Sequence, residues 1–136
     1  MIAPDTNVLV RIITNDDVSQ ATLAADVLRS NTVFLCKTVI MELEWVLRYS
    51  YGFDRATVGK ALTTLIGLGN SVIEDAVAVE KAVELHAEGM DLADALHLSS
   101  SVGVDTFVTF DRKMAMGASD KGISPTVRLL TDTERD

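Results

Sequence analysis

Four acidic side chains stand at positions from which they could share one reactive site. They are Asp5, Glu42, Asp94 and Asp111. Asp5 and Asp111 each end a short apolar run, which is typical of a buried strand, whereas the other two acids lie early in segments with helical periodicity. A helix that joins parallel strands runs antiparallel to them, so its first turn lies at the edge where the strands end. All four carboxylates can therefore meet at one sheet edge, with Asp91 one helical turn before Asp94.

Clustered carboxylates repel one another unless a cation lies between them. Oxygen ligands of this kind suit Mg²⁺ or Mn²⁺, and the chain lacks the set of Cys and His residues that a zinc site needs. Such a cation lowers the pKa of a bound water molecule and stabilises the charge that develops on an attacked phosphodiester. The four acids therefore predict metal-assisted hydrolysis without a covalent enzyme intermediate.

Each acid also has a purely structural explanation. Asp5, Asp91 and Asp111 are good helix N-caps, and Asp94 suits the positive end of a helix dipole. On the third predicted helix two glutamates, Glu42 and Glu44, flank the apolar stripe on opposite sides, and periodicity does not decide which one faces a site. Capping and a shared site both stay open at this point.

The elements that would position these acids follow from the apolar pattern. Five strands are predicted at residues 2–5, 32–36, 71–74, 106–110 and 126–130. Seven helices are predicted at residues 7–13, 17–29, 38–52, 54–68, 75–88, 91–102 and 111–116, with Asp17 or Ser19, Thr38 and Asp54 as caps of the second, third and fourth. Strands that alternate with helices indicate an α/β fold, here a single domain over residues 1–136 with a parallel sheet of about five strands flanked by helices.

Composition narrows the class of protein further. The 136 residues are 48% hydrophobic, enough for one core, and 20 acidic residues against 12 basic ones give a net charge of −8. That charge disfavours nucleic-acid binding unless cations neutralise the acids. We expect no membrane span or signal peptide, and one cysteine, Cys36, cannot form an internal disulfide. We therefore expect a cytoplasmic protein.

Four motifs carry a resemblance to a known family. They are Asp5-Thr6-Asn7-Val8-Leu9-Val10, Val39-Ile40-Met41-Glu42-Leu43, Asp91-Leu92-Ala93-Asp94-Ala95-Leu96-His97 and Thr109-Phe110-Asp111-Arg112. In this order and spacing the chain resembles PIN-domain ribonucleases of the VapC toxin type. The resemblance implies a five-stranded parallel sheet, an Mg²⁺- or Mn²⁺-dependent endoribonuclease that acts on RNA, a homodimer, and inhibition by a cognate VapB-type antitoxin.

The same resemblance assigns roles to individual residues. It implies metal ligation by Asp5, Glu42, Asp94 and Asp111, and it prefers Glu42 over Glu44. It implies supporting roles around the site for Thr6, Asn7, Asp91 and Thr109. Pro4 departs from the family, which more often has an apolar strand residue there, and it removes one backbone donor beside the first acid.

Other functions compete with this interpretation. A phosphoacceptor receiver domain also carries acids at a sheet edge, but it needs a second acid beside Asp5 and a basic residue after a late strand. A catalytically inactive PIN-like binding module, a metal-independent ribonuclease that uses His86 and His97, and a Cys36 nucleophile are further alternatives. Arg11, Arg48, Arg112 and Lys113 are either RNA contacts or surface charges, and Trp45 and Tyr49 are core residues or, less favoured, partner contacts. His86 fits an apolar wall better than a ligand.

Overall fold

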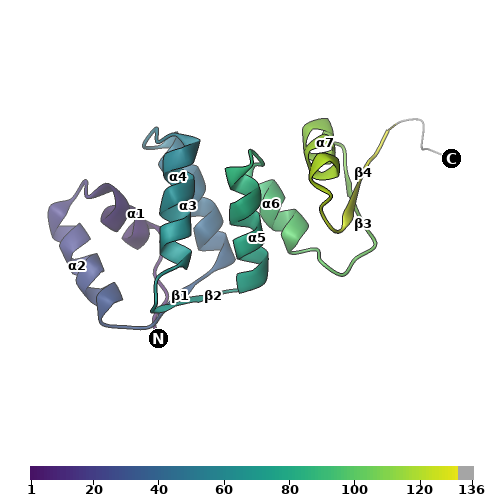
Figure 1. Cartoon of the computed structure of the whole chain (residues 1–136). Helices are drawn as coiled ribbons and strands as arrows, with labels where there is room; N and C mark the ends of the chain where they lie inside the picture. Colours follow the sequence, from purple (N-terminus) through teal and green to yellow (C-terminus); the bar gives the residue numbers. More distant parts are fainter. Residues whose placement is uncertain (132–136) are drawn as a thin grey trace.

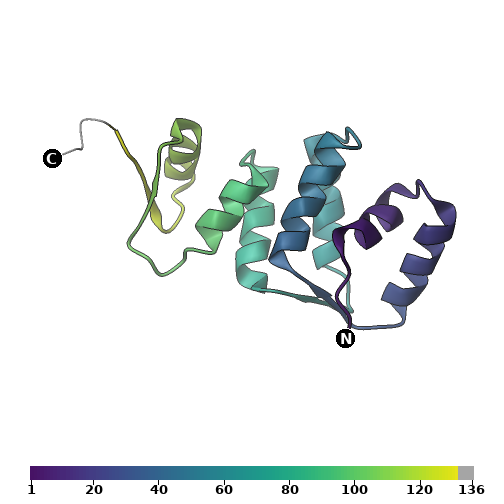
Figure 2. The ribbon, with the colours of Figure 1, turned by 180° about the vertical axis from the view of Figure 1, so that it is seen from behind.

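The computed structural model describes residues 1–131, in which seven helices and two small sheets are arranged along an elongated molecule (Figure 1). The helices are α1 (Thr6–Thr14), α2 (Val18–Arg29), α3 (Lys37–Tyr49), α4 (Arg55–Ile66), α5 (Ala76–Ala87), α6 (Leu92–Ser99) and α7 (Arg112–Lys121). Seen from behind, α1 lies beside α3, which it contacts (Figure 2). One or two helices separate each strand from the next, and the paired strands are parallel, which confirms the predicted α/β class.

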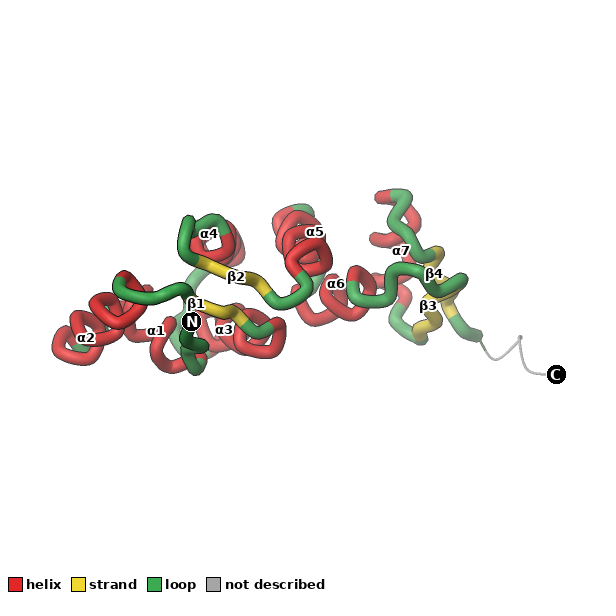
Figure 3. Tube along the Cα trace, turned by 90° about the horizontal axis from the view of Figure 1, so that it is seen from below, coloured by secondary structure: helices red, strands yellow, loops and turns green. Residues whose placement is uncertain are grey.

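The strands form two separate parallel pairs. β1 (Val33–Leu35) pairs with β2 (Ser71–Ile73), and β3 (Thr106–Thr109) pairs with β4 (Thr126–Leu129). Figure 3 shows the second pair at the far end of the molecule, beyond α6. The parallel direction agrees with the prediction. The single sheet of about five strands does not, because the described residues contain two sheets of two strands each.

The first predicted strand is reduced to one paired residue, Ile2. Its amide donates to Thr32 O at 2.8 Å and its carbonyl accepts from Phe34 N at 2.7 Å, which makes an isolated bridge to Val33. Pro4 has no N–H group to continue the ladder, and the chain enters α1 two residues later. Residues 100–105 then lead β3 away from this edge, so the two sheets stay apart (Figure 3).

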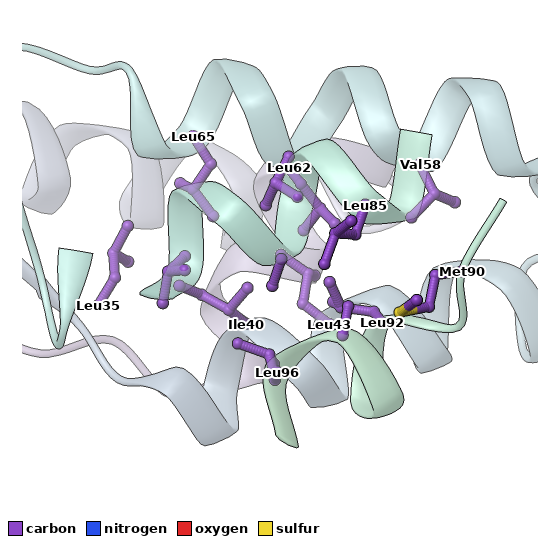
Figure 4. Close-up of a cluster of buried hydrophobic side chains, with 14 of the residues drawn as sticks. Leu35, Ile40, Leu43, Val58, Leu62, Leu65, Leu85, Met90, Leu92 and Leu96 are labelled. Carbon is purple, nitrogen blue, oxygen red and sulfur yellow. The ribbon is translucent and has the colours of Figure 1, made fainter. Parts of the chain in front are cut away.

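The core lies among α3, α4, α5 and α6 (Figure 4). Its fully buried side chains include Leu35, Ile40, Leu43, Val58, Leu62 and Leu92. On α3 the buried residues recur at helical spacing, as the apolar pattern predicts. Met114 and Ala118 join the same cluster, so packing against the core fixes α7.

Helix N-caps follow the local sequence closely. Asp17 and Asp54 cap α2 and α4, with Asp54 Oδ1 accepting from Thr57 N at 2.8 Å. The predicted cap Thr38 is wrong, because α3 begins at Lys37 with Cys36 at the cap position, and Lys37 N donates to Glu74 Oε1 at 2.8 Å. The longest helix, α3, has 13 residues, and no helix of the described part combines the length and apolarity that crossing a membrane requires.

Candidate active site

An acidic pocket of about 220 Å³ opens where α6 and α7 begin, beside the α5–α6 connection. Its lining residues are Glu88, Gly89, Met90, Asp91, Asp94, Asp111, Lys113, Met114 and Gly117. Two of the four predicted ligands, Asp94 and Asp111, therefore face the same space, together with the predicted supporting residue Asp91. Asp94 lies on α6, and Asp111 immediately precedes α7. The distance between their carboxylates therefore depends on how α7 docks against α6.

Capping hydrogen bonds place these carboxylates. Asp91 Oδ2 accepts from Asp94 N at 3.2 Å, and Asp111 Oδ1 accepts from Met114 N at 3.0 Å. Thr109 Oγ1 accepts from Asp111 N at 3.0 Å, which fixes the backbone just before α7. The capping role and the pocket-lining role that the sequence left as alternatives are thus combined in Asp91 and Asp111.

Electrostatics link the three acids of the pocket. Partial burial raises the pKa of Asp94, and the negative charges of Asp91 and Asp111 raise it further, while His97 acts weakly in the opposite direction. The ionised form of Asp94 is therefore disfavoured without a nearby cation. A divalent cation in the pocket would remove that penalty.

The other two predicted ligands form a second group, at the start of α1 and on α3. Asp5 caps α1, and its Oδ1 accepts from Thr6 N at 2.7 Å. The Thr6 side chain is only 3% exposed, and its hydroxyl donates to Glu42 Oε1. Both carboxylates are exposed, so Thr6 holds them together while leaving them open to solvent. Asn7 faces elsewhere, into a groove between α1 and α2.

The acids of the two groups and Thr6 offer carboxylate and hydroxyl oxygens, which suit Mg²⁺ or Mn²⁺, while Lys113 brings a positive charge to the lining of the pocket. The sequence predicts that all four acids meet in one cleft, whereas the structure places them in two groups of two. Within residues 1–131, no three Asp, Glu, His or Cys side chains come close enough together to hold one metal ion. The structure thus brings Asp5 near Glu42 through Thr6, and Asp94 near Asp111 through the pocket.

Glu44, the second glutamate of α3, has a different environment from Glu42. It is 3% exposed, and its Oε2 lies 3.1 Å from Nε2 of the fully buried His86. Arg48, one turn later, forms an ion pair with the same carboxylate, with Nη2 donating to Oε1 at 3.2 Å. Burial alone would raise the pKa of Glu44, but the hydrogen bonds from His86 and Arg48 and the charge of Arg48 outweigh it and lower that pKa.

The sequence pattern does not predict this buried group of Glu44, Arg48 and His86, although it contains two local signals of it. Glu44 and Arg48 have the i, i+4 spacing of a helical ion pair, and His86 lies on an apolar stripe. His86 is the wall residue that the pattern favours, but its partner is 42 positions away in the chain. Only the folded structure, which brings His86 on α5 to Glu44 on α3, reveals that connection.

The structure also shows the surroundings of the residues considered for RNA contact, partner contact or catalysis. Trp45 and Tyr49 are 55% and 62% exposed, so the favoured prediction of core packing is wrong: their face of α3 points away from the core. Arg11 pairs with Asp16 at 3.3 Å, and His97 is exposed. Arg112 and Lys113 are exposed at the start of α7, and Cys36 is partly buried after β1.

Comparison with known proteins gives one match. The family model described as PIN domain matches residues 2–118. No curated protein and no solved structure matches the chain. The match spans both acidic groups, from Asp5 to Asp111, and ends within α7.

Proposed function

We propose a function from the premise that this chain belongs to the PIN domain family, whose members are generally metal-dependent nucleases. The proposal is an Mg²⁺- or Mn²⁺-dependent endoribonuclease that acts in the cytoplasm as the toxin of a toxin–antitoxin pair. The observation that carries it is the acidic pocket, where Asp94 lies beside Asp91 and Asp111, and where burial and then these two negative charges raise its pKa. A site that disfavours its own negative charge is one that a divalent cation stabilises.

The proposed ligands are Asp5, Glu42, Asp94 and Asp111. When bound, the cation would lower the pKa of a water molecule and stabilise charge on the attacked phosphodiester. The chain's own residues orient the carboxylates: Thr6 donates to Glu42, and the backbone amide of Met114 holds Asp111. Asp91 fixes the first turn of α6 and so the position of Asp94.

The direct test is cleavage of a single-stranded RNA by the purified full-length chain with Mg²⁺, Mn²⁺ or excess EDTA. Asp94→Asn should lower kcat/KM by about a hundredfold or more, because a lost metal ligand removes several kcal/mol of transition-state stabilisation. Glu80→Gln, which neutralises an exposed acid on α5, is the matched control and should leave the rate unchanged. Cleavage by Asp94→Asn at the parental rate would contradict the proposal.

The same assay separates the competing functions. Cleavage that survives excess EDTA would favour a metal-independent ribonuclease that uses His86 and His97. Covalent phosphorylation of Asp5 by a small phosphodonor would favour a receiver domain. Absence of RNA cleavage by the parental chain with either metal would favour an inactive binding module.

We propose a VapB-type antitoxin as the protein partner. Support comes from a groove of about 420 Å³ between α1 and α2, whose lining includes the apolar side chains Val8, Leu23, Ala24 and Val27. An amphipathic helix with basic residues would match both this groove and the net charge of −8. The test is co-purification with the product of a neighbouring small basic reading frame, which Leu23→Asp should abolish without changing the proposed homodimer in sedimentation.

A further inference from the structure

Arg48 occupies a position between a buried acid and the acidic pocket. Its Nη2 donates to Glu44 Oε1 at 3.2 Å and lies 3.6 Å from Asp91 Oδ1. Arg48 comes from α3, whereas Asp91 caps α6 and lines the pocket. One guanidinium therefore faces two carboxylates that belong to different parts of the fold.

The contact between Arg48 and Glu44 is fixed by the burial of Glu44. Glu44 stays ionised, so His86 Nε2 must carry the proton of their 3.1 Å hydrogen bond. A buried carboxylate is tolerated only when charged or polar partners compensate for its lost hydration. His86 and Glu44 thus hold the Arg48 side chain, which is 21% exposed, in one place.

The contact between Arg48 and Asp91 places a positive charge beside the acidic pocket. Asp91 lines the pocket beside Asp94, whose backbone amide donates to Asp91 Oδ2 at 3.2 Å, so two like charges lie one helical turn apart there. A positive charge close to Asp91 offsets part of that repulsion. Lys113 also lines the pocket, from α7. Arg48 differs from Lys113 because it reaches Asp91 from outside the lining and leaves the pocket itself open.

We propose that Arg48 is the resident counter-cation of the acidic pocket, held by the buried Glu44–His86 pair so that it neutralises Asp91 until a divalent cation binds. This inference rests on the proposed function, since it concerns the same pocket. Arg48 is a positioning residue in this scheme: it contacts neither substrate nor metal, and it acts through Asp91. Removal of its charge should strengthen metal binding, in contrast to the loss of a ligand.

The test compares the parental chain with the double variant Glu44→Gln/Arg48→Met in Mg²⁺ titrations followed by Tm, and Glu44→Gln alone shows what loss of the anchoring carboxylate does. The double variant leaves no orphaned charge in the core, and the pair of variants differs only in the guanidinium. We expect the apparent Kd for Mg²⁺ to be about two- to fivefold lower in the double variant, the size of effect that a partly exposed ion pair gives. An unchanged or higher Kd would overturn the inference.

Two controls make the result specific to Asp91. In an Asp91→Asn background the removal of Arg48 should no longer change the Mg²⁺ affinity, whereas a general field effect would persist and would overturn the assignment. Arg29→Met removes the guanidinium that pairs with Asp26 on α2, and it should leave the affinity unchanged. If the Glu44→Gln variants do not fold, Arg48→Lys is compared with the parental chain instead, because a lysine cannot span both carboxylates.

Failure of the proposed function gives a different result. If Mg²⁺ and Mn²⁺ leave the Tm of the parental chain unchanged, the proposed metal site is absent. The contact between Arg48 and Asp91 can then still be measured in the metal-free protein. A double-mutant cycle between Arg48→Lys and Asp91→Asn then measures their coupling through unfolding. A coupling equivalent to a twofold or larger change in the unfolding constant supports the resident cation, and no coupling overturns it.

Discussion

Glu44 and Asp94 are two partly or fully buried acids whose neighbours give them opposite properties. Glu44 lies between His86 and Arg48, and their hydrogen bonds lower its pKa in spite of burial. Asp94 lies in a pocket with Asp91 and Asp111, where burial and like charges raise its pKa. The first environment gives the carboxylate hydrogen-bond donors from two side chains and so keeps it ionised inside the fold. The second leaves a charge unsatisfied, which is what a cation-binding site requires.

The largest effect should come from Glu44→Ala. This change leaves the guanidinium of Arg48 and the buried ring of His86 without their shared acceptor. We expect the free energy of unfolding to fall by about 3 kcal/mol, the cost of breaking a buried ion pair from one side. Urea denaturation followed by circular dichroism measures it, with Glu42→Ala as the exposed control on the same helix.

Glu42→Ala should cost only about 1 kcal/mol, because its carboxylate is exposed and the change removes one acceptor, that of the buried Thr6 hydroxyl. Equal losses for the two variants would mean that burial does not separate the two glutamates. The comparison between a structural acid and a site acid would then have no basis on α3.

The second effect concerns pH and has opposite signs for the two acids. Because the pKa of Glu44 is lowered in the folded state from 4.5, its stabilising contribution is present above pH 4.5 and is lost as pH falls through the folded value. The pKa of Asp94 is raised from 3.8, so its protonated form favours folding. That contribution is present below pH 3.8 and is lost as pH rises through the folded value.

Acid titrations of stability in EDTA check these signs. Relative to the parental chain, Glu44→Gln should flatten the loss of stability below pH 4.5. Asp94→Asn should gain relative stability as pH rises above 3.8. If both variants shift the profile in the same direction, their environments do not differ as the contacts indicate.

Local features of the fold could be predicted from sequence, because their physics is local. Asp5, Asp54, Asp91 and Asp111 all cap helices, as their positions before apolar helical stripes indicate. The two parallel pairs also agree with alternating strands and helices. The single sheet of five strands is the part that the sequence pattern could not establish. It requires β3 to pair with the segment at Ile2, and pairing between segments about a hundred residues apart leaves no local signal in the sequence.

The candidate site divides in the same way. Asp94 and Asp111 meet because α6 and α7 both begin at the pocket, which helix direction predicts. The choice between Glu42 and Glu44 depends on which side of α3 faces α5, and that packing joins residues 42 positions apart. Periodicity identifies the stripe of a helix but does not identify the partner of a residue at its margin.

The smallest effect should be a gain in stability from Asp94→Asn in the metal-free protein. Asp91 and Asp94 are like charges three residues apart at the start of α6, and removing one should raise the free energy of unfolding by about 0.3 kcal/mol. Asp26→Asn on α2 is the matched opposite, since Asp26 pairs with Arg29 three residues later, and it should lower stability by about the same amount. Both are measured by urea denaturation in EDTA and again with Mg²⁺.

With Mg²⁺ the sign of the stability change for Asp94→Asn should reverse, because the variant loses a ligand that the parental chain keeps. A loss of stability in EDTA would instead assign Asp94 a structural role like that of Glu44, and the distinction between the two acids would disappear.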